Sequence, residues 1–192
     1  VSGSLSMSIR DTWDIENITF DISGGEGEIL AKEISREPLL VRNVLFRGEV
    51  DGSISKLQVD RALINFYGPI AEISGEVIRI DSSIKMKLNG RLAAVAVNRV
   101  ADFWPESLAS NSRKWIIRNV RDGIIDTATF SLNALSDLDD IEDISISKAQ
   151  GELELREAYI HYLRPMKPLK ISKSKAYYDG EKFVFDIDGG SV

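Results

Sequence analysis

The sequence predicts a mainly β protein, built on an extended antiparallel sheet with one short amphipathic helix near the middle of the chain. Short runs of alternating apolar and polar residues recur along most of the sequence, as in strands with one buried and one solvated face. Clusters of Gly, Asn and Asp separate these runs and supply the positive φ angles of tight hairpin turns. A single stretch, WPESLASNSRKWIIRNV at 104–120, departs from this alternation and has helical spacing.

The alternating runs predict roughly twelve to fourteen short strands, most of them joined by hairpins. The polar positions hold Ser, Thr, Asp, Lys and Arg, so these strands are not expected to be buried on both faces. The clearest runs lie at 5–9, 18–22, 57–59 and 84–88 before the helix, and at 130–132, 144–146, 153–155, 160–162 and 183–187 after it. Turn sequences lie at 23–27, 50–53, 89–90 and 178–181.

Three segments place a Gly-Glu pair at the start of an alternating run: FRGEVDGSI, ISGEVIRID and AQGELELRE. The matches are too short to define a repeat of fixed period. They indicate one structural unit that is used several times along a growing sheet.

The helix is expected at about 105–121, where it divides strands within 1–103 from strands within 124–192. Pro105 suits a first helical turn, Arg118 complements the negative end of the helix dipole, and Gly123 can end the helix. A break at Ser110-Asn111 is compatible with the pattern. The helix is expected to pack against the sheet, although its tryptophans and basic residues also suit an anionic membrane surface. The residues expected to pack it are Trp104, Leu108, Trp115, Ile116 and Val120.

One helix is too small to cover the apolar face of such a sheet. A helix of about 14 residues is ~21 Å long, whereas twelve strands at ~4.8 Å spacing make a sheet ~58 Å wide. The remaining cover is a second sheet, the curl of the sheet itself or a bound apolar ligand. For each interior residue, the alternative to a face open to an apolar ligand is an ordinary dry core. The residues expected to face this interior are Phe20, Ile22, Val59, Met86, Leu88, Phe130, Leu132, Leu153, Leu155, Phe183 and Phe185.

Composition argues against several classes of function. The 192 residues carry a net charge of −6 with scattered Lys and Arg, so nucleic acid is not an expected partner. The absence of cysteine excludes disulfides, thiol catalysis and Cys-based zinc sites. No apolar run approaches the ~18–20 residues that cross a bilayer, and the strand-like ends suggest one segment, 1–192, of a longer protein.

Catalytic and metal-binding motifs are missing from the sequence. His161 is the only histidine and is expected to be an ordinary strand residue. The acidic run DLDDIED at 137–143 lacks the ligand order of an EF-hand, so a solvated turn is expected there. No G-x-S-x-G elbow or P-loop is present, and only paired carboxylates for glycoside hydrolysis remain open on spacing alone. The chain is therefore not expected to be an enzyme or to hold a cofactor or metal.

The pattern W-P-x-x-L-A-x-x-x-R-x-W-I-x-x-N-V-x-x-G, which begins at Trp104, resembles the central signature of the AsmA-like family of Gram-negative bacteria. Within that family it is most similar to the YhdP- and TamB-type branch. The flanking segments FDISGGEGEI and PLLVRNVLFRGEVDG, and the segment that begins with GELELREAYIHYLRP, are similar to the family's recurrent strands. The resemblance therefore extends along most of the chain.

This resemblance implies a periplasmic segment of a bridge-like lipid transfer protein, anchored to the inner membrane through a segment absent from this sequence. It implies a curled, half-pipe sheet whose hydrophobic groove conducts phospholipid and so supports the outer-membrane barrier. The partners implied are phospholipid, neighbouring segments of the same long chain, and the membranes at the ends of the full-length protein. The competing hypotheses are a non-conducting scaffold in outer-membrane protein biogenesis and a β-sandwich for adhesion or carbohydrate binding.

Overall fold

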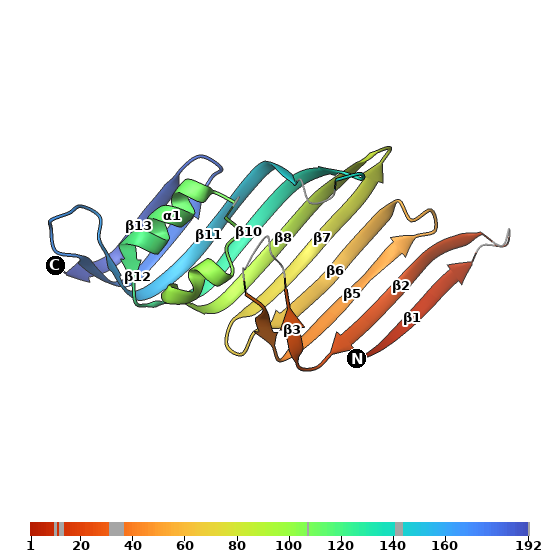
Figure 1. Ribbon diagram of the computed structural model, residues 1–192, viewed down its shortest axis with the longest axis horizontal. Helices are drawn as coiled ribbons and strands as arrows, with labels where there is room; N and C mark the ends of the chain where they lie inside the picture. Colours follow the sequence, from red (N-terminus) through yellow and green to blue (C-terminus); the bar gives the residue numbers. More distant parts are fainter. Residues whose placement is uncertain (10, 12–13, 31–36, 107, 141–143, 192) are drawn as a thin grey trace. The chain divides into compact units, whose positions relative to one another are not determined.

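A computed structural model describes residues 1–9, 11, 14–30, 37–106, 108–140 and 144–191. Strands account for 67% of the chain and helices for 9%, so the predicted mainly β fold is confirmed. The large sheet is antiparallel and not closed, and its strands can be followed in chain order in Figure 1.

Thirteen strands are described, and most pair with their neighbours in the sequence, as the turn signals predict. The large sheet has the order β1-β2-β5-β6-β7-β8-β10-β11-β12-β13, β9 pairs with β11, and β3 pairs with β4 separately. The bounds are β1 Ser2–Ile9, β2 Ile15–Gly24, β3 Gly27–Ile29, β4 Leu39–Val41, β5 Asn43–Asp51, β6 Lys56–Asn65, β7 Ile70–Ile80, β8 Ser83–Ala96, β9 Val120–Arg121, β10 Ile124–Asp137, β11 Ser145–Ile160, β12 Leu169–Tyr178 and β13 Phe183–Ser191.

Contacts divide the chain into two compact units, where the sequence predicts one segment. The first unit contains Val1–Gly27, Val41–Gly90 and Ser131–Lys148. The second unit contains Glu28–Leu40, Arg91–Phe130 and Ala149–Val192. Each is described by itself below.

The middle of the chain forms two helices, a 3-10 helix η1 at Val97–Asp102 and the α-helix α1 at Ser110–Asn119. The α-helix therefore begins five residues later than the predicted start at 105, and Ser110, where a break was predicted, is its first residue. The reason is Ala109, whose left-handed φ of 47° separates α1 from the turn that Pro105 begins. Gly123 does not end the helix, since α1 stops at Asn119 and the chain passes directly into β9.

The side chain of Arg113 holds the turn before α1 in place. Its Nε donates to the carbonyl of Trp104 at 2.7 Å, and its Nη2 donates to the carbonyl of Ala101 at 3.2 Å. The indole Nε1 of Trp104 in turn donates to the carbonyl of Leu108 at 2.7 Å. Side-chain donors thus satisfy the carbonyls of Trp104 and Leu108, which a continuous helix would have paired with its own N–H groups. They also satisfy the carbonyl of Ala101, which such a helix would leave unpaired because Pro105 has no N–H.

Residues paired in the antiparallel register of the first unit separate into an apolar and a polar face. The polar face holds ion pairs such as Arg47 with Asp21 at 2.7 Å and Arg61 with Glu72 at 2.7 Å. These pairs are exposed and contribute little to stability, so the apolar face decides the packing. Its directly opposed pairs include Leu5 with Phe20, Met7 with Ile18, Ile22 with Phe46, Val44 with Ile64, and Val50 with Leu57.

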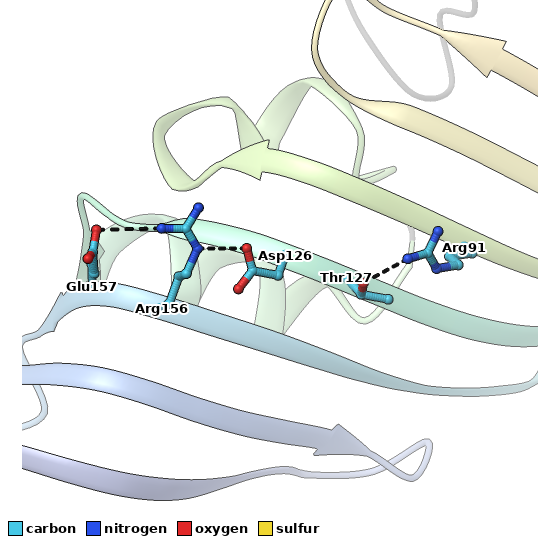
Figure 2. A network of polar contacts seen from close by, with 5 residues as sticks. All are labelled: Arg91, Asp126, Thr127, Arg156 and Glu157. Atoms are coloured by element: carbon cyan, nitrogen blue, oxygen red, sulfur yellow. Dashed lines mark hydrogen bonds and ion pairs between the residues drawn. The ribbon is translucent and has the colours of Figure 1, made fainter.

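The second unit has the same division between faces. Figure 2 shows its polar face, where Arg156 Nε lies 2.7 Å from Asp126 Oδ1 and Arg91 donates to the hydroxyl of Thr127 at 3.1 Å. The pKa of Arg156 is raised, first by its hydrogen bond to Asp126 and then by that carboxylate's charge. The opposite face is buried and forms the core described below.

The alternation of the second unit slips by one residue in β11 and β12 at the same place. Leu155 is opposite Ser174, and Ala158 is opposite Ile171, and all four residues are buried. In each strand the buried residues on either side of the slip are three positions apart instead of two. Both strands shift by the same amount, so the register survives the slip. Glu157 takes the extra position in β11 with a left-handed φ of 54°. The apolar face therefore continues past a point where strict alternation would have reversed it.

The three Gly-Glu pairs have a local structural explanation. A Cβ atom added to Gly48 would lie 2.1 Å from the carbonyl oxygen of Gln58, and one added to Gly75 would lie 2.1 Å from that of Lys87. One added to Gly151 would lie 2.8 Å from that of Thr129. Each glycine thus marks a close approach of a neighbouring strand, and register shifts lie beside Gly48 and Gly75.

Candidate apolar groove

Six of the predicted interior residues lie in the first unit: Phe20, Ile22, Val59, Met86, Leu88 and Leu132. The register places Phe20 opposite Gly48, and Val59 is opposite both Gly48 and Gly75. A Cβ added to Gly75 would also meet the Cα of Leu88, so β8 continues the same face. The structure therefore brings the predicted residues of β2, β6 and β8 onto one apolar face.

Much of this face is accessible to solvent. Leu5 is 72% exposed, Met7 49% and Ile22 41%, although all three lie on the apolar side of their strands. The rings of Phe20 and Phe46 are in tilted contact, with their centroids 4.8 Å apart, and remain half-buried, whereas Val59 is buried. Both helices belong to the second unit, so no described helix belongs to the unit that carries this face. We name the set Leu5, Met7, Ile18, Phe20, Ile22, Phe46, Val59, Met86 and Leu88 the open apolar face. Leu132 of β10 is half-buried and belongs to the same unit.

The remaining predicted interior residues lie in the second unit, where protein covers them. Leu153 is 7% exposed and Leu155 3%, and both belong to a buried cluster with Ile116 of α1. Phe183 and Phe185 pack against this cluster. Phe130 is half-buried and lies over Gly151 on the neighbouring strand. The side chains of this cluster form a dry core, which leaves the first unit as the candidate groove.

The residues that were predicted to pack the helix make aromatic contacts with β13 or are partly or fully buried. The ring centroids of Trp104 and Phe183 are 6.2 Å apart, and those of Trp115 and Phe185 are 5.5 Å apart. Ile116 is 4% exposed and Val120, now the first residue of β9, is 3% exposed. The remaining predicted residue, Leu108, is half-buried in the turn before α1. Figure 1 shows α1 over the strands at the C-terminal end of the chain, with its axis roughly along them.

A second site, which sequence analysis did not single out, is a pocket of about 330 Å³ in the second unit. Four residues of α1 and four residues that follow β11 line it together. The only sequence signal for it is the pair of cations Lys114 and Arg118, one helical turn apart, with His161 and Arg164 far along the chain. The lining residues are Lys114, Trp115, Arg118, Asn119, His161, Tyr162, Leu163 and Arg164.

Among the described residues, Asp51 is the acidic group with a strongly shifted pKa, and it has a structural role in a hairpin. The carboxylate of Asp51 accepts hydrogen bonds from Ser53 Oγ, from the N–H and hydroxyl of Ser55 and from the N–H of Lys56. These bonds, that of Ser53 first, hold the pKa of Asp51 well below its ordinary value of 3.8. The ionised carboxylate therefore fixes the turn between β5 and β6.

Few of the described polar residues lie in clusters of the kind found in catalytic or metal-binding sites. Within the described residues, no cluster of His, Asp and Glu has the arrangement of a metal site. His161 is half-buried, and its backbone N–H donates to the carbonyl of Asn119 at 2.8 Å. At the acidic run, the N–H of Asp139 donates to the Asp137 carboxylate at 3.0 Å, as in a turn, while 141–143 lie outside the described residues. None of the helices described is both long and apolar enough to span a membrane.

Comparisons with protein-family models, with curated proteins and with solved structures find no match to this chain. They assign no family, and the resemblance of the stretch that begins at Trp104 to the AsmA-like family stays a prediction. The geometry of the two units is therefore the basis for the function proposed below.

Proposed function

We propose that this chain is a lipid-transfer module whose apolar sheet face conducts phospholipid in the periplasm between the inner and the outer membrane. In this proposal it belongs to a longer protein of the AsmA-like type, anchored to the inner membrane elsewhere. The observation that carries the proposal is the open apolar face of the first unit, where Leu5 is 72% exposed and Ile22 41%. Its cargo supports the outer-membrane barrier.

An apolar face of this kind suits the transport of acyl chains. Burial of apolar surface stabilises by about 25 cal/mol per Å², and the effect has no preferred direction. An acyl chain that leaves the rings of Phe20 and Phe46 for Met86 or Leu88 therefore exchanges one apolar contact for another. No deep energy minimum holds the acyl chain at one strand, so the acyl chain can move along the face.

The second unit has a different part in this proposal. Its apolar face is filled by α1, η1 and the strands themselves, with Val95, Ala158 and Ile171 each 0% exposed. A filled core resists deformation because its side chains are closely packed. The helix therefore acts as a brace rather than as a wall of the groove.

The runner-up is a scaffold in outer-membrane protein biogenesis, and one observation favours it. β1 and β13 end the strand order of the large sheet, so each presents one edge without a described partner strand. Free strand edges are sites where another chain can add a strand. In the lipid-transfer proposal these edges pair with neighbouring segments of the same long chain instead.

Photo-crosslinking within β8 tests the proposal. A crosslinker at Met86 lies on the open apolar face, whereas one at Lys87 lies on the polar face, where that lysine pairs with Glu76 at 3.1 Å. In cells that make the full-length protein, we expect phospholipid adducts at Met86 and none at Lys87. Leu132 and its exposed neighbour Asn133 provide the same comparison in β10.

The crosslinking outcomes separate the two candidate functions. Protein adducts at Met86 and Leu132, without lipid, would favour the scaffold and exclude conduction along this face. Equal lipid capture at Met86 and Lys87 would show non-specific membrane contact and would also count against a groove. Mass spectrometry of lipid extracted from the purified chain provides an independent measurement.

A further inference from the structure

The pocket between α1 and the segment after β11 combines three cations with an apolar wall. Lys114 and Arg118 come from α1, and Arg164 comes from the segment 161–164. No Asp or Glu lines this pocket, although the chain has 30 acidic residues against 24 basic ones. Among the described residues, none of these three cations takes part in an ion pair.

The fold holds these cations together by backbone and side-chain hydrogen bonds. The N–H of His161 donates to the carbonyl of Asn119 at 2.8 Å, and Nδ2 of Asn119 donates to the carbonyl of Trp115 at 2.9 Å. Ile160 is opposite Val120 in the register of β11 and β9, which brings the end of α1 beside the segment after β11. Three like charges are thus kept close by contacts that do not neutralise them.

Helix electrostatics explain only part of this charge cluster. A cation in the last turn of a helix, such as Arg118, is stabilised by the negative end of the dipole within about one turn. Lys114 lies one turn earlier and Arg164 lies on another segment. The three exposed groups leave a local positive charge that suits an anion, and two guanidinium groups suit the oxygens of a phosphate.

The wall beside the cations is apolar and accessible. Trp115 is 37% exposed, Tyr162 45% and Leu163 59%. Tryptophan and tyrosine with one apolar side and one polar atom are suited to the boundary between a headgroup and an acyl chain. The volume of about 330 Å³ lies near the lower end of small-molecule sites, which fits a headgroup but not an entire lipid.

We propose that this pocket binds the phosphate of a phosphate-bearing amphiphile, with the apolar part of the ligand against Trp115, Tyr162 and Leu163. The identification of that amphiphile as phospholipid rests on the proposed lipid-transfer function. The pocket is lined by residues of the second unit only, and none of them belongs to the open apolar face. The two sites can therefore be tested independently.

The test measures binding of monomeric dihexanoylphosphatidylglycerol to the purified chain by calorimetry, with inorganic phosphate as the second ligand. We expect K114Q/R118Q to weaken binding of the short lipid about tenfold or more, because two charge-assisted contacts are lost. The matched control R121Q removes an exposed cation next to α1 that does not line the pocket, and it should leave binding within about twofold. Both altered residues of the double variant are exposed, and circular dichroism checks that the fold is retained.

Each outcome decides one part of the proposal. Tighter binding of the short lipid than of inorganic phosphate, lost in K114Q/R118Q and weakened in Y162A, supports the amphiphile site. Equal binding of the two ligands, equal loss in R121Q, or unchanged binding in K114Q/R118Q overturns it. Lipid adducts at Met86 that persist when the pocket is inactive would show that the lipid-transfer proposal stands without this pocket. Binding of the short lipid at the pocket without lipid adducts at Met86 would show that the pocket proposal stands without lipid transfer along the open apolar face.

Discussion

Replacing one leucine on each apolar face measures which face is covered in solution. Leu155 is 3% exposed in the core of the second unit, whereas Leu5 is 72% exposed on the open apolar face of the first. A Leu→Ala change in a packed core costs about 2–5 kcal/mol, from lost transfer energy and the cavity left behind. Full burial of a leucine is worth about 1.5–3 kcal/mol, so the small buried share of Leu5 makes Leu5→Ala cost less than about 1 kcal/mol.

Urea denaturation followed by circular dichroism separates these two values. With a slope of about 2 kcal/mol per molar for a domain of this size, Leu155→Ala should lower the midpoint by about 1–2.5 M. Leu5→Ala should lower it by less than about 0.5 M. A shift for Leu5→Ala as large as that for Leu155→Ala would show that protein covers the first unit's apolar face in solution. The physical basis for a lipid groove would then be lost.

Three further predictions concern the backbone and one carboxylate. Ile54→Gly should raise the free energy of unfolding by up to about 1 kcal/mol, because Ile54 is 68% exposed and holds a left-handed φ of 53°; Ile54→Val, which keeps that strain, should give no gain in the same urea titration. Gly75→Ala should cost about 2 kcal/mol or more, since a Cβ would lie 2.1 Å from the Lys87 carbonyl, whereas Gly25→Ala, with open space around it, should be nearly neutral in thermal melts. The folded-state pKa of Asp51 is depressed, so its contribution is present above the ordinary value of 3.8 and is lost as pH falls towards the folded pKa. Asp51→Asn should therefore be less stable than the wild type at pH 6, with the difference shrinking below about pH 4, and a difference independent of pH would contradict this role.

The strands and their faces were predictable because a period of two is a local property of the sequence. Leu5, Phe20 and Met86 alternate with polar neighbours, and the register places Leu5 directly opposite Phe20 on the predicted face. The slip at Glu157 was not predictable in the same way. Glutamate has no special preference for a left-handed φ, and the slip is stable only because β12 slips at the same place.

The start of the helix and the cationic pocket depended on contacts that the sequence pattern does not contain. Pro105 is a favourable first helical residue, which is why the predicted helix began there. The left-handed Ala109 and the hydrogen bonds of Arg113 to Trp104 and Ala101 delay the helix instead. Likewise, Arg164 joins Lys114 only through the pairing of β9 with β11, which connects residues about 40 positions apart in the chain.

The reach of α1 explains why one strand pattern has two outcomes. Helix α1 runs along the strands, because Trp104 before it contacts Phe183 at the start of β13 and Val120 after it is opposite Ile160 at the end of β11. With its side chains a helix is about 10–12 Å wide, which matches about two strand spacings of 4.8 Å. Its aromatic contacts, Trp115 with Phe185 and Trp104 of the preceding turn with Phe183, place this cover over β13 and the strands beside it. Leu153 and Leu155 lie within that reach and are dry. The first unit has the same alternation but no described helix of its own, so Leu5, Met7 and Ile22 stay in contact with solvent. Alternation thus selects the side of the strand, and the width of the covering helix limits how many strands it covers on that side.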